Sequence, residues 1–440
     1  MKQILLWVLL AQTLCLYNIM DFGAVPNSDT VPDQFKNQQA LLKAIAAANS
    51  SEGERVVRVP PKKFYAMPAH LTNIHNITFE FMGKWVASKS VRYWPHQPNS
   101  KNYEDFLAFD RCSHLTFTGG GTIDGRGYHW WMLLFLNDKK WLGNENWRPH
   151  LVHFRDTNFI TMYELTLKNS PQWFVKLDGS NDGHFYNMNI KVNTTAQVNL
   201  AKKFSLEGAI VMFPFNTDGF DPSGARYHFH NLTVQNWDDV VVPKPRGEKD
   251  CTRDMLIEDC KVILGVGMSI GSVPPAGDVA CIRNITFRNV EMKRPLKGIY
   301  LKSNPGDRGS GIVENIYFKN FTMDRPVWWA VYLGPQQMKE PDGDGPGCML
   351  YPLGPCSTQP RVTFRNITLE DVSIHKSLLY PYTIRCNVSN PCTDINFYNV
   401  RTDSWRLGLK QKGYVCEYAM GHMKNTIPKI SCLDEVGDTP

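Results

Sequence analysis

The sequence lacks an apolar run long enough to cross a membrane. The run from Ile4 to Leu16 follows a basic start at Lys2 and gives way to polar, turn-rich sequence from Asn18. A membrane span needs about 20 apolar residues, and this shorter run has the layout of a secretory signal peptide. We therefore expect a signal peptide at 1–16, cleaved near Cys15, and one secreted, extracellular domain at 17–440 that does not bind membranes.

The sequence also lacks a CxxC pair and a cluster of histidines along the chain, so a zinc site is not expected. We expect no metal and no cofactor. Of eleven cysteines, ten remain after the expected loss of Cys15, an even number that suits disulfides in an oxidising compartment. Close spacing favours three pairs, which are Cys348 with Cys356, Cys386 with Cys392, and Cys416 with Cys432.

No Lys/Arg run is present, although Lys and Arg (48) outnumber Asp and Glu (42) and give a net charge of +6. We therefore expect no nucleic-acid partner, and the mild positive charge is compatible with an acidic polymer. The content of 42% hydrophobic and 20% charged residues is typical of a globular protein and argues against disorder.

Asn-x-Ser/Thr sequons are frequent, which supports export and places these asparagines at the surface. They begin at Asn49, Asn76, Asn193, Asn231, Asn284, Asn320, Asn366 and Asn387. Five of them share the form N-[ILF]-T, which suggests one repeating structural position.

Helical periodicity is almost absent beyond residue 70, where short β-branched and aromatic runs recur between Asn, Asp and Gly. Such runs are compatible with a β-sandwich, a propeller or a solenoid. Successive runs lack the hairpin turns of a sandwich, which favours parallel strands stacked coil on coil. We predict an all-β solenoid, a single parallel β-helix, from about residue 70, with a helix at 36–48 capping its end. A longer insertion is expected near 338–360.

Carboxylates gather in the segment "PFNTDGFDPSG" at 214–224, which contains Asp218 and Asp221, and in "NWDD", which contains Asp238 and Asp239. Asn, Asp and Gly are common in plain loops. However, one coil of stacking would bring Asp238 and Asp239 beside Asp218, provided that the strand bends so that both face one cleft. Three adjacent acids raise one another's pKa, which favours a catalytic role over three solvated acids on separate turns.

The sequence resembles the polygalacturonase family of glycoside hydrolases, secreted pectin-degrading enzymes that are right-handed parallel β-helices. The stretches that carry the resemblance are "YNIMDFGA" (17–24), "GGGTIDGRGYHWW" (119–131), "NSPQWFV" (169–175), "NTDGFD" (216–221), "NWDD" (236–239), "GVGMSIGS" (265–272) and "GIYLKS" (298–303). The resemblance implies that Asp238 is the general acid, and that Asp218 and Asp239 hold and deprotonate the attacking water. The family inverts the anomeric centre, for which we expect acid and base roughly 6.5–9.5 Å apart.

The resemblance also implies a site that binds a uronate polymer as its partner, in a protein that acts as a monomer. Lys302 matches a family lysine that meets a substrate carboxylate, and Asn216 and Lys244 are further substrate-binding candidates.

Two substrate-binding positions depart from the family pattern. Val266 stands where the family usually has histidine, and Tyr300 where it usually has arginine. Valine cannot form hydrogen bonds through its side chain, and tyrosine cannot make the bidentate contact that arginine makes to a carboxylate. Candidate replacement donors are His228, His230, Lys244 and Gln336.

The leading functional hypothesis is a hydrolase that acts on galacturonic-acid-containing pectin. Alternatives are a hydrolase for another backbone such as rhamnogalacturonan or another polyuronide, a non-catalytic sugar-binding β-helix, and a lyase with a calcium site. Retention of all three acids argues against the non-catalytic protein, because buried carboxylates are costly without a use.

Overall fold

The computed structural model describes residues 14–142, 147–195, 199, 214–274, 278–306, 308–338, 347–348, 351, 354–406 and 413–437. Residues 1–13 of the expected signal peptide and most of the expected insertion near 338–360 lie outside the described residues. None of the described helices combines the length and apolar character that a membrane crossing requires.

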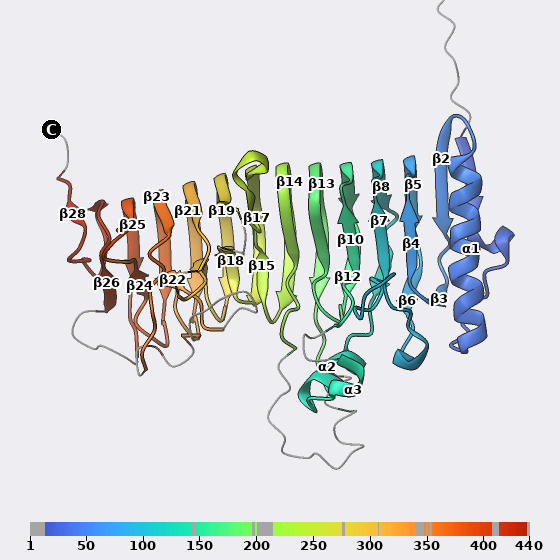
Figure 1. Cartoon of the computed structure of the whole chain (residues 1–440), viewed down its shortest axis with the longest axis horizontal. Coiled ribbons are helices and arrows are strands. Elements are labelled where there is room, and N and C mark those ends of the chain that lie inside the picture. Colours follow the sequence, from blue (N-terminus) through green and yellow to red (C-terminus); the bar gives the residue numbers. More distant parts are fainter. Residues whose placement is uncertain are drawn as a thin grey trace, which may run out of the picture.

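The described strands stack into a parallel β-helix whose coils follow one another along a single long axis (Figure 1). The first column of paired strands includes the longest ones. It contains β1 (Leu14–Asn18), β2 (Glu54–Val59), β5 (His75–Phe81), β8 (Ser113–Thr118), β11 (Asn158–Tyr163), β13 (Val175–Lys191), β14 (Phe220–Asn236), β17 (Thr252–Leu264), β19 (Ala280–Lys293), β21 (Gly311–Asp324), β23 (Val362–His375), β25 (Thr393–Thr402), β27 (His422–Lys424) and β28 (Asp434–Glu435).

A second column, continued by the first residues of β13 and β14, forms the floor of the candidate site. Its strands are β4 (Ala69–Thr72), β7 (Leu107–Asp110), β10 (Val152–Arg155), β15 (Asp239–Val241), β18 (Gly267–Val273), β20 (Ile299–Ser303), β22 (Val331–Pro335), β24 (Tyr382–Arg385) and β26 (Tyr414–Glu417). A short third column contains β3 (Lys63–Ala66), β6 (Lys84–Ala87), β9 (Thr122–Asp124) and β12 (Thr166–Lys168). Pairings between named strands within the described ranges are parallel except that of β16 (Arg246–Gly247) with β19.

The core consists of equivalent residues of successive coils stacked on one another. Aromatic rings are spaced at about the strand-to-strand distance, as for Phe109 and Phe154 (5.2 Å) and for Phe287 and Phe318 (4.9 Å). Buried and more exposed residues alternate along much of β23, whereas β20, β22 and β24 are buried at every position. Residues one coil apart in the sequence are therefore neighbours in space, which confirms the predicted stacking.

The N-terminal end is capped by helix α1 (Val31–Asn49), which confirms the helix expected at 36–48 and extends it on the N-terminal side. Thr30 is its N-cap, and the buried side chains of α1 include Leu41 and Ile45. The β-helix starts earlier than the expected residue 70, because β1 already pairs in parallel with β2. β1 contains Cys15 and Leu16, so cleavage after residue 16 would leave only part of that strand.

Helices α2 (Tyr128–Phe135) and α3 (Lys139–Leu142) were not expected from the sequence. They project from one edge of the β-helix beside the site (Figure 1). Trp130 and Trp131 of α2 are almost fully buried, and this burial of aromatic surface explains why a sequence without clear helical periodicity is helical there. Short 3₁₀ turns are η1 (Ile19–Phe22), η2 (Val91–Tyr93) and η3 (Glu248–Asp250).

The five N-[ILF]-T asparagines occupy two positions on the coil, not the single position expected. Asn284 and Asn366 belong to one ladder of side-chain hydrogen bonds, joined through Asn315, whereas Asn320 belongs to a second ladder through Asn289. The strand register places Asn76 at the same corner of the coil as the first ladder, and Asn231 at the same corner as the second ladder. All five are exposed and have positive φ, a conformation that asparagine tolerates at a tight corner.

The three expected disulfides are confirmed, and a fourth joins Cys251 to Cys281. Cys112 and Cys260 are buried free thiols, so the even number of cysteines does not mean that all ten are paired.

Candidate active site

Three aspartates converge on the floor of the candidate site. Asp218 lies just before β14, Asp238 lies just before β15, and Asp239 is the first residue of β15. One carboxylate oxygen from each lies within 4.8 Å of the others. The backbone bends at Asp238, directly before β15, and oxygens of both neighbouring acids meet, which confirms the expected bend.

The position directly after Asp218 requires glycine because two backbone segments approach closely there. Its backbone N–H donates to the carbonyl of Asp239 (2.9 Å), which ties the two acid-bearing segments together. A Cβ at position 219 would lie 2.4 Å from the carbonyl oxygen of Val240. Only glycine permits this close approach.

Each acid has a different set of partners. Asp238 accepts the backbone N–H groups of Asn216 and Asp239, both at 2.9 Å. Asp239 accepts the hydroxyl of Ser269 through Oδ1 and forms an ion pair with Lys302 through Oδ2. Oδ1 of Asp218 is buried and accepts no hydrogen bond from the described residues.

These surroundings separate the pKa values of the three acids. Burial and repulsion from Asp239 raise the pKa of Asp238, although Lys302 opposes the shift. Burial also tends to raise the pKa of Asp239, but Lys302 and other groups outweigh it and the net pKa is lowered. Burial, together with Asp221 and Asp238, raises the pKa of Asp218 well above its ordinary value. The arrangement therefore favours an ionised Asp239 next to a protonated Asp238.

The closest oxygens of the three acids lie within 4.8 Å of one another. The expected separation of roughly 6.5–9.5 Å between the acid and base groups stays a prediction. The close approach follows from stacking, since equivalent positions of neighbouring coils are only about 4.7–4.9 Å apart.

Two lysines meet the acids, Lys302 from β20 and Lys244 from the loop between β15 and β16. Nζ of Lys244 lies 3.1 Å from Asp221, whose pKa is raised to about 7 by burial against the opposing effect of Lys244. The Lys244 ammonium also lies 4.9 Å from the ring centre of Trp173. Asp221 therefore lies in the same charged network as Lys302 and Asp239, which the sequence analysis did not predict.

Arg148 holds the loop that carries Asn216 and was missed in the sequence analysis. Its guanidinium donates to the side-chain oxygen of Asn216 (2.9 Å) and to the carbonyls of Pro171 and Phe215. Burial lowers the pKa of Arg148 to about 9, while Asp238 and Asp218 oppose the shift. The side-chain oxygen of Asn216 is thus engaged with Arg148, and its backbone N–H with Asp238.

The two departures from the family pattern belong to one apolar cluster. Val266 and Tyr300 are buried together with three further aromatic side chains, those of Trp329, Tyr332 and Tyr380. Val266 contributes to the acids through its backbone, since its N–H donates to the carbonyl of Asp238 (2.7 Å). One buried apolar and aromatic cluster therefore contains both residues that stand where the family usually has histidine and arginine.

Lys297 is a buried lysine of this aromatic cluster that the sequence analysis did not single out. Its Nζ lies 3.5 Å from the ring centre of Tyr300 and 4.8 Å from that of Trp328. Both Lys297 and the Tyr300 hydroxyl donate to the side-chain oxygen of Gln337, each at 2.5 Å. Burial and the charge of Lys302 hold the pKa of Lys297 well below its usual value. The sequence signal that could have identified Lys297 is its position directly before the motif "GIYLKS" (298–303).

The candidate replacement donors do not all reach the site. Gln336 is buried at the end of β22, where its side chain donates to Asn304 (3.2 Å). His228 and His230 follow the corner at Arg226, which has positive φ, and therefore lie on another face of the coil. Of the four, Lys244 is the one that contacts the network of acids.

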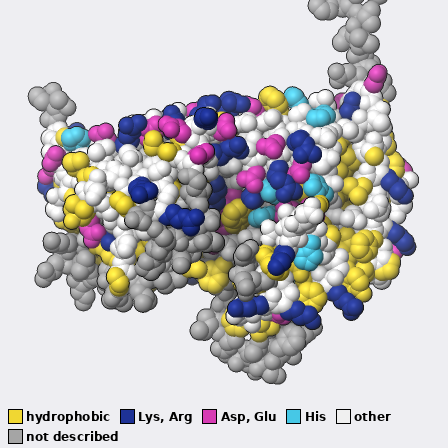
Figure 2. All heavy atoms as spheres, viewed as in Figure 1, with side chains coloured by type: hydrophobic (Ala, Val, Ile, Leu, Met, Phe, Trp, Pro, Cys, Tyr) yellow, Lys and Arg dark blue, Asp and Glu magenta, His cyan; other side chains and the backbone are white. Residues whose placement is uncertain are grey.

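A cavity of about 330 Å³ adjoins the site on its N-terminal side and was also missed. Its lining includes Arg148 and Trp173, which contact the residues of the site described above, together with His150 and His153. Both imidazoles contact the buried carboxylate of Asp105 at 2.7 Å. Figure 2 shows acidic, basic and histidine side chains gathered near the middle of the face in view. The space beside the acids is thus lined with polar groups.

The family model described as glycosyl hydrolases family 28 matches residues 50–333, which contain all three acids and Lys302. The chain belongs to glycosyl hydrolases family 28. It is a glycoside hydrolase, as the resemblance implied.

Similar proteins include a probable rhamnogalacturonase C of Aspergillus niger, 27% identical over 407 residues that cover 92% of this chain and 72% of that protein. A probable exopolygalacturonase B of Aspergillus terreus is 26% identical over 379 residues, covering 82% of this chain and 78% of that one.

Among solved structures, an exopolygalacturonase from Thermotoga maritima has a TM-score of 0.68 at 18% identity and covers 96% of this chain and 93% of that one. An endo-xylogalacturonan hydrolase from Aspergillus tubingensis has a TM-score of 0.67 at 18% identity, with 94% and 97% coverage. These likenesses confirm the right-handed parallel β-helix.

Proposed function

We propose that this protein hydrolyses glycosidic bonds of a galacturonic-acid-containing polysaccharide of the pectin class. The observation that carries the proposal is the convergence of Asp218, Asp238 and Asp239 in one buried site, with Lys302 paired to Asp239. Membership of family 28 and the similarity to a probable rhamnogalacturonase and a probable exopolygalacturonase support the same class of substrate.

In the proposed reaction Asp238 is the general acid. Its raised pKa keeps a proton available for the leaving glycosidic oxygen, and the two backbone N–H groups hold its carboxyl group in place. Asp239, ionised beside Lys302, takes the proton of the attacking water. The buried Oδ1 of Asp218 is available to hold the same water.

We propose that the reaction inverts the anomeric centre, with one water held between Asp218 and Asp239 while Asp238 protonates the bond. Following the anomeric proton signals during early hydrolysis tests this step. An inverted first product supports it, whereas a retained configuration would indicate a covalent intermediate, which short carboxylate spacings permit.

We further propose that the natural substrate is a decorated or mixed-backbone pectin rather than plain polygalacturonate. Val266 and Tyr300 belong to a buried aromatic and apolar cluster where the family places a hydrogen-bonding imidazole and a guanidinium. Neither buried side chain can form the bidentate contact to a uronate carboxylate that arginine forms. The similarity to a rhamnogalacturonase and to a xylogalacturonan hydrolase also favours a decorated or mixed-backbone substrate.

The test is a comparison of kcat/KM on polygalacturonate, rhamnogalacturonan and xylogalacturonan, with reducing ends measured with and without a metal chelator. We expect chelator-independent hydrolysis that is fastest on one of the two mixed or decorated polymers. Fastest cleavage of plain polygalacturonate would refute the proposed preference. Unsaturated products that disappear with chelator would indicate a lyase, and sugar binding without product would indicate a binding protein.

We also propose that the mature protein is secreted and glycosylated and that it acts as a monomer. The four disulfides and the exposed N-[ILF]-T asparagines support export and glycosylation. Recovery from culture medium, the mass change after deglycosylation and the sedimentation coefficient test the three statements.

A further inference from the structure

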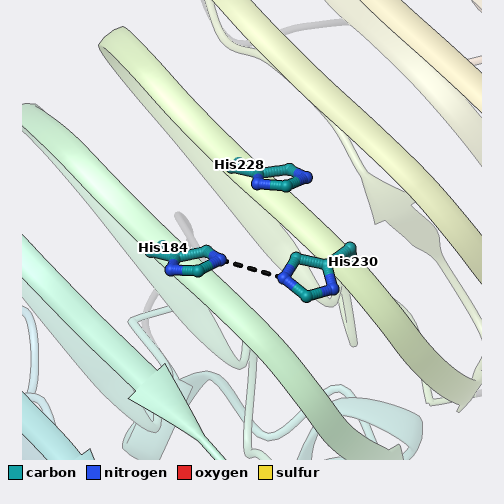
Figure 3. Close-up of side chains that lie close together, drawn as sticks. All are labelled: His184, His228 and His230. Atoms are coloured by element: carbon teal, nitrogen blue, oxygen red, sulfur yellow. Dashed lines mark hydrogen bonds between the residues drawn. The ribbon is translucent and has the colours of Figure 1, made fainter.

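Three histidines meet on the outer face of β13 and β14, beyond the corner that separates this face from the three aspartates. They are His184, His228 and His230, and one ring nitrogen from each lies within 4.8 Å of the others (Figure 3). All three side chains are half-buried. They are absent from the proposed hydrolytic chemistry.

Strand register explains why these residues meet. His184 of β13 pairs with His228 of β14, and Tyr186 pairs with His230, so the three imidazoles stand on the same side of two adjacent strands. His184 and His228 are 44 positions apart in the sequence but pair across neighbouring strands, which is why the grouping is hidden in the linear sequence. The pair His228 and His230, two residues apart on one strand, is its only local trace.

Two of the three rings already approach each other through nitrogens at a distance suited to shared ligation. Nε2 of His184 lies 2.9 Å from Nε2 of His230, and Figure 3 shows the two rings edge to edge with the His228 ring beside them. Nitrogen ligands of one ion, each bonded at about 2.0–2.1 Å, lie roughly 2.9–3.4 Å apart for bond angles of 90 to 110°. The observed contact falls in that range.

Neighbouring side chains hold the rings in place. The His184 ring is stacked on that of His228 (5.2 Å between centres, 7° between planes), and His230 is stacked on Tyr186 (5.1 Å, 2°). Glu258 accepts a hydrogen bond from Nε2 of His228 at 2.8 Å and is itself held by Arg288 at 2.6 Å. A carboxylate on the second nitrogen of a ligating histidine is the usual means of fixing its orientation.

We propose that His184, His228 and His230 form a binding site for a divalent late transition-metal ion such as Zn²⁺ or Cu²⁺, with Glu258 orienting His228. Imidazole nitrogens select these ions over Ca²⁺ and Mg²⁺, which prefer oxygen ligands. This proposal departs from the expectation of no metal, which rested on the absence of a CxxC pair and of histidines clustered along the sequence.

The test is isothermal titration calorimetry of Zn²⁺ into the purified, untagged full chain at pH 7.5. The variants are His228→Gln, His230→Gln and the double substitution, with His422→Gln, an exposed histidine of β27 far along the axis, as the matched control. We expect each single variant to weaken binding at this site at least tenfold and the double variant to abolish it, while the control binds as wild type. Glu258→Gln should weaken binding about 10–100-fold.

Co²⁺ gives a second readout, because its visible absorption reports nitrogen ligation directly. We expect a Co²⁺ spectrum in wild type and in His422→Gln that is lost in the double variant, with unchanged far-UV circular dichroism and polysaccharide hydrolysis. Equal Zn²⁺ affinity and an equal Co²⁺ spectrum in wild type and the double variant would overturn the site, and so would the absence of Zn²⁺ binding to wild type. Either result leaves the proposed hydrolase function unaffected.

Discussion

Nζ of Lys302 lies against Oδ2 of Asp239 in an ion pair whose side chains are only 10% and 1% exposed. The lysine comes from β20 and the aspartate from β15, two strands apart in the second column of strands. Lys302 lowers the pKa of Asp239 and also opposes the rise in the pKa of Asp238. One lysine therefore sets the ionisation of both residues proposed as base and acid.

The pH dependence of hydrolysis follows from these directions. Activity needs ionised Asp239 and protonated Asp238, so it is lost as the pH falls through the lowered pKa of Asp239. It is lost again as the pH rises through the raised pKa of Asp238. Replacing Lys302 with Met removes a charge that lowers both values, so both limbs of the profile should move to higher pH.

The measurement is kcat/KM against pH for wild type and Lys302→Met, with Lys293→Met, an exposed lysine of β19, as the control. A reduced maximum with unmoved limbs would mean that Lys302 acts on the substrate alone and does not set the ionisation of the two acids.

Restoring the family arginine at position 300 meets an obstacle that the sequence does not show. Nζ of Lys297 lies 3.5 Å from the centre of the Tyr300 ring, so Tyr300→Arg would place a guanidinium beside a second buried basic group. Like charges in a buried cluster destabilise it. We expect Tyr300→Arg to lower the free energy of unfolding by about 1–3 kcal/mol, and Lys297→Gln in the same chain to recover part of the loss.

Thermal unfolding of the single and double variants checks this, and a Tyr300→Arg protein as stable as wild type would contradict it. The triple variant with Val266→His, Tyr300→Arg and Lys297→Gln should gain kcat/KM on polygalacturonate specifically, because it supplies a donor and a cation for the uronate carboxylate.

Asn315 joins two neighbours in the first asparagine ladder and is not itself part of a sequon. It donates to Asn284 (3.0 Å), accepts from Asn366 (2.8 Å) and has a φ of 58°. Alanine there loses both hydrogen bonds and is strained at positive φ, whereas glycine loses the bonds alone. We expect Asn315→Ala to destabilise by about 1–3 kcal/mol and Asn315→Gly by less, measured by urea denaturation. Equal losses would show that backbone strain does not contribute at this corner.

The coil architecture and the three acids were predictable from the sequence, because both depend on a spacing that the sequence displays. Asp218 and Asp238 are 20 residues apart, and parallel stacking turns that separation into contact. The disulfides at Cys348, Cys386 and Cys416 were predictable for a similar reason, since each partner is close in the chain.

The remaining features depend on register and packing, which spacing alone does not specify. Arg148 reaches Asn216 across 68 residues, and His184 meets His230 across 46. Whether the sequon asparagines occupy one or two corner positions on the coil can be predicted only if the exact first and last residue of each strand is known. Helix α2 is stabilised by burial of Trp130 and Trp131 against the rest of the fold, which local periodicity does not reveal.

The most direct test of the proposed chemistry is kcat/KM of Asp238→Asn on the best polysaccharide substrate, beside Asp250→Asn, whose carboxylate is 76% exposed, as the control. Asparagine keeps the size of the side chain but cannot supply the proton, and general acid catalysis is worth about 10²–10⁴-fold. We predict a loss of that size in Asp238→Asn with unchanged circular dichroism, and wild-type activity in Asp250→Asn. An Asp238→Asn protein that hydrolyses the polymer at the wild-type rate would contradict the account.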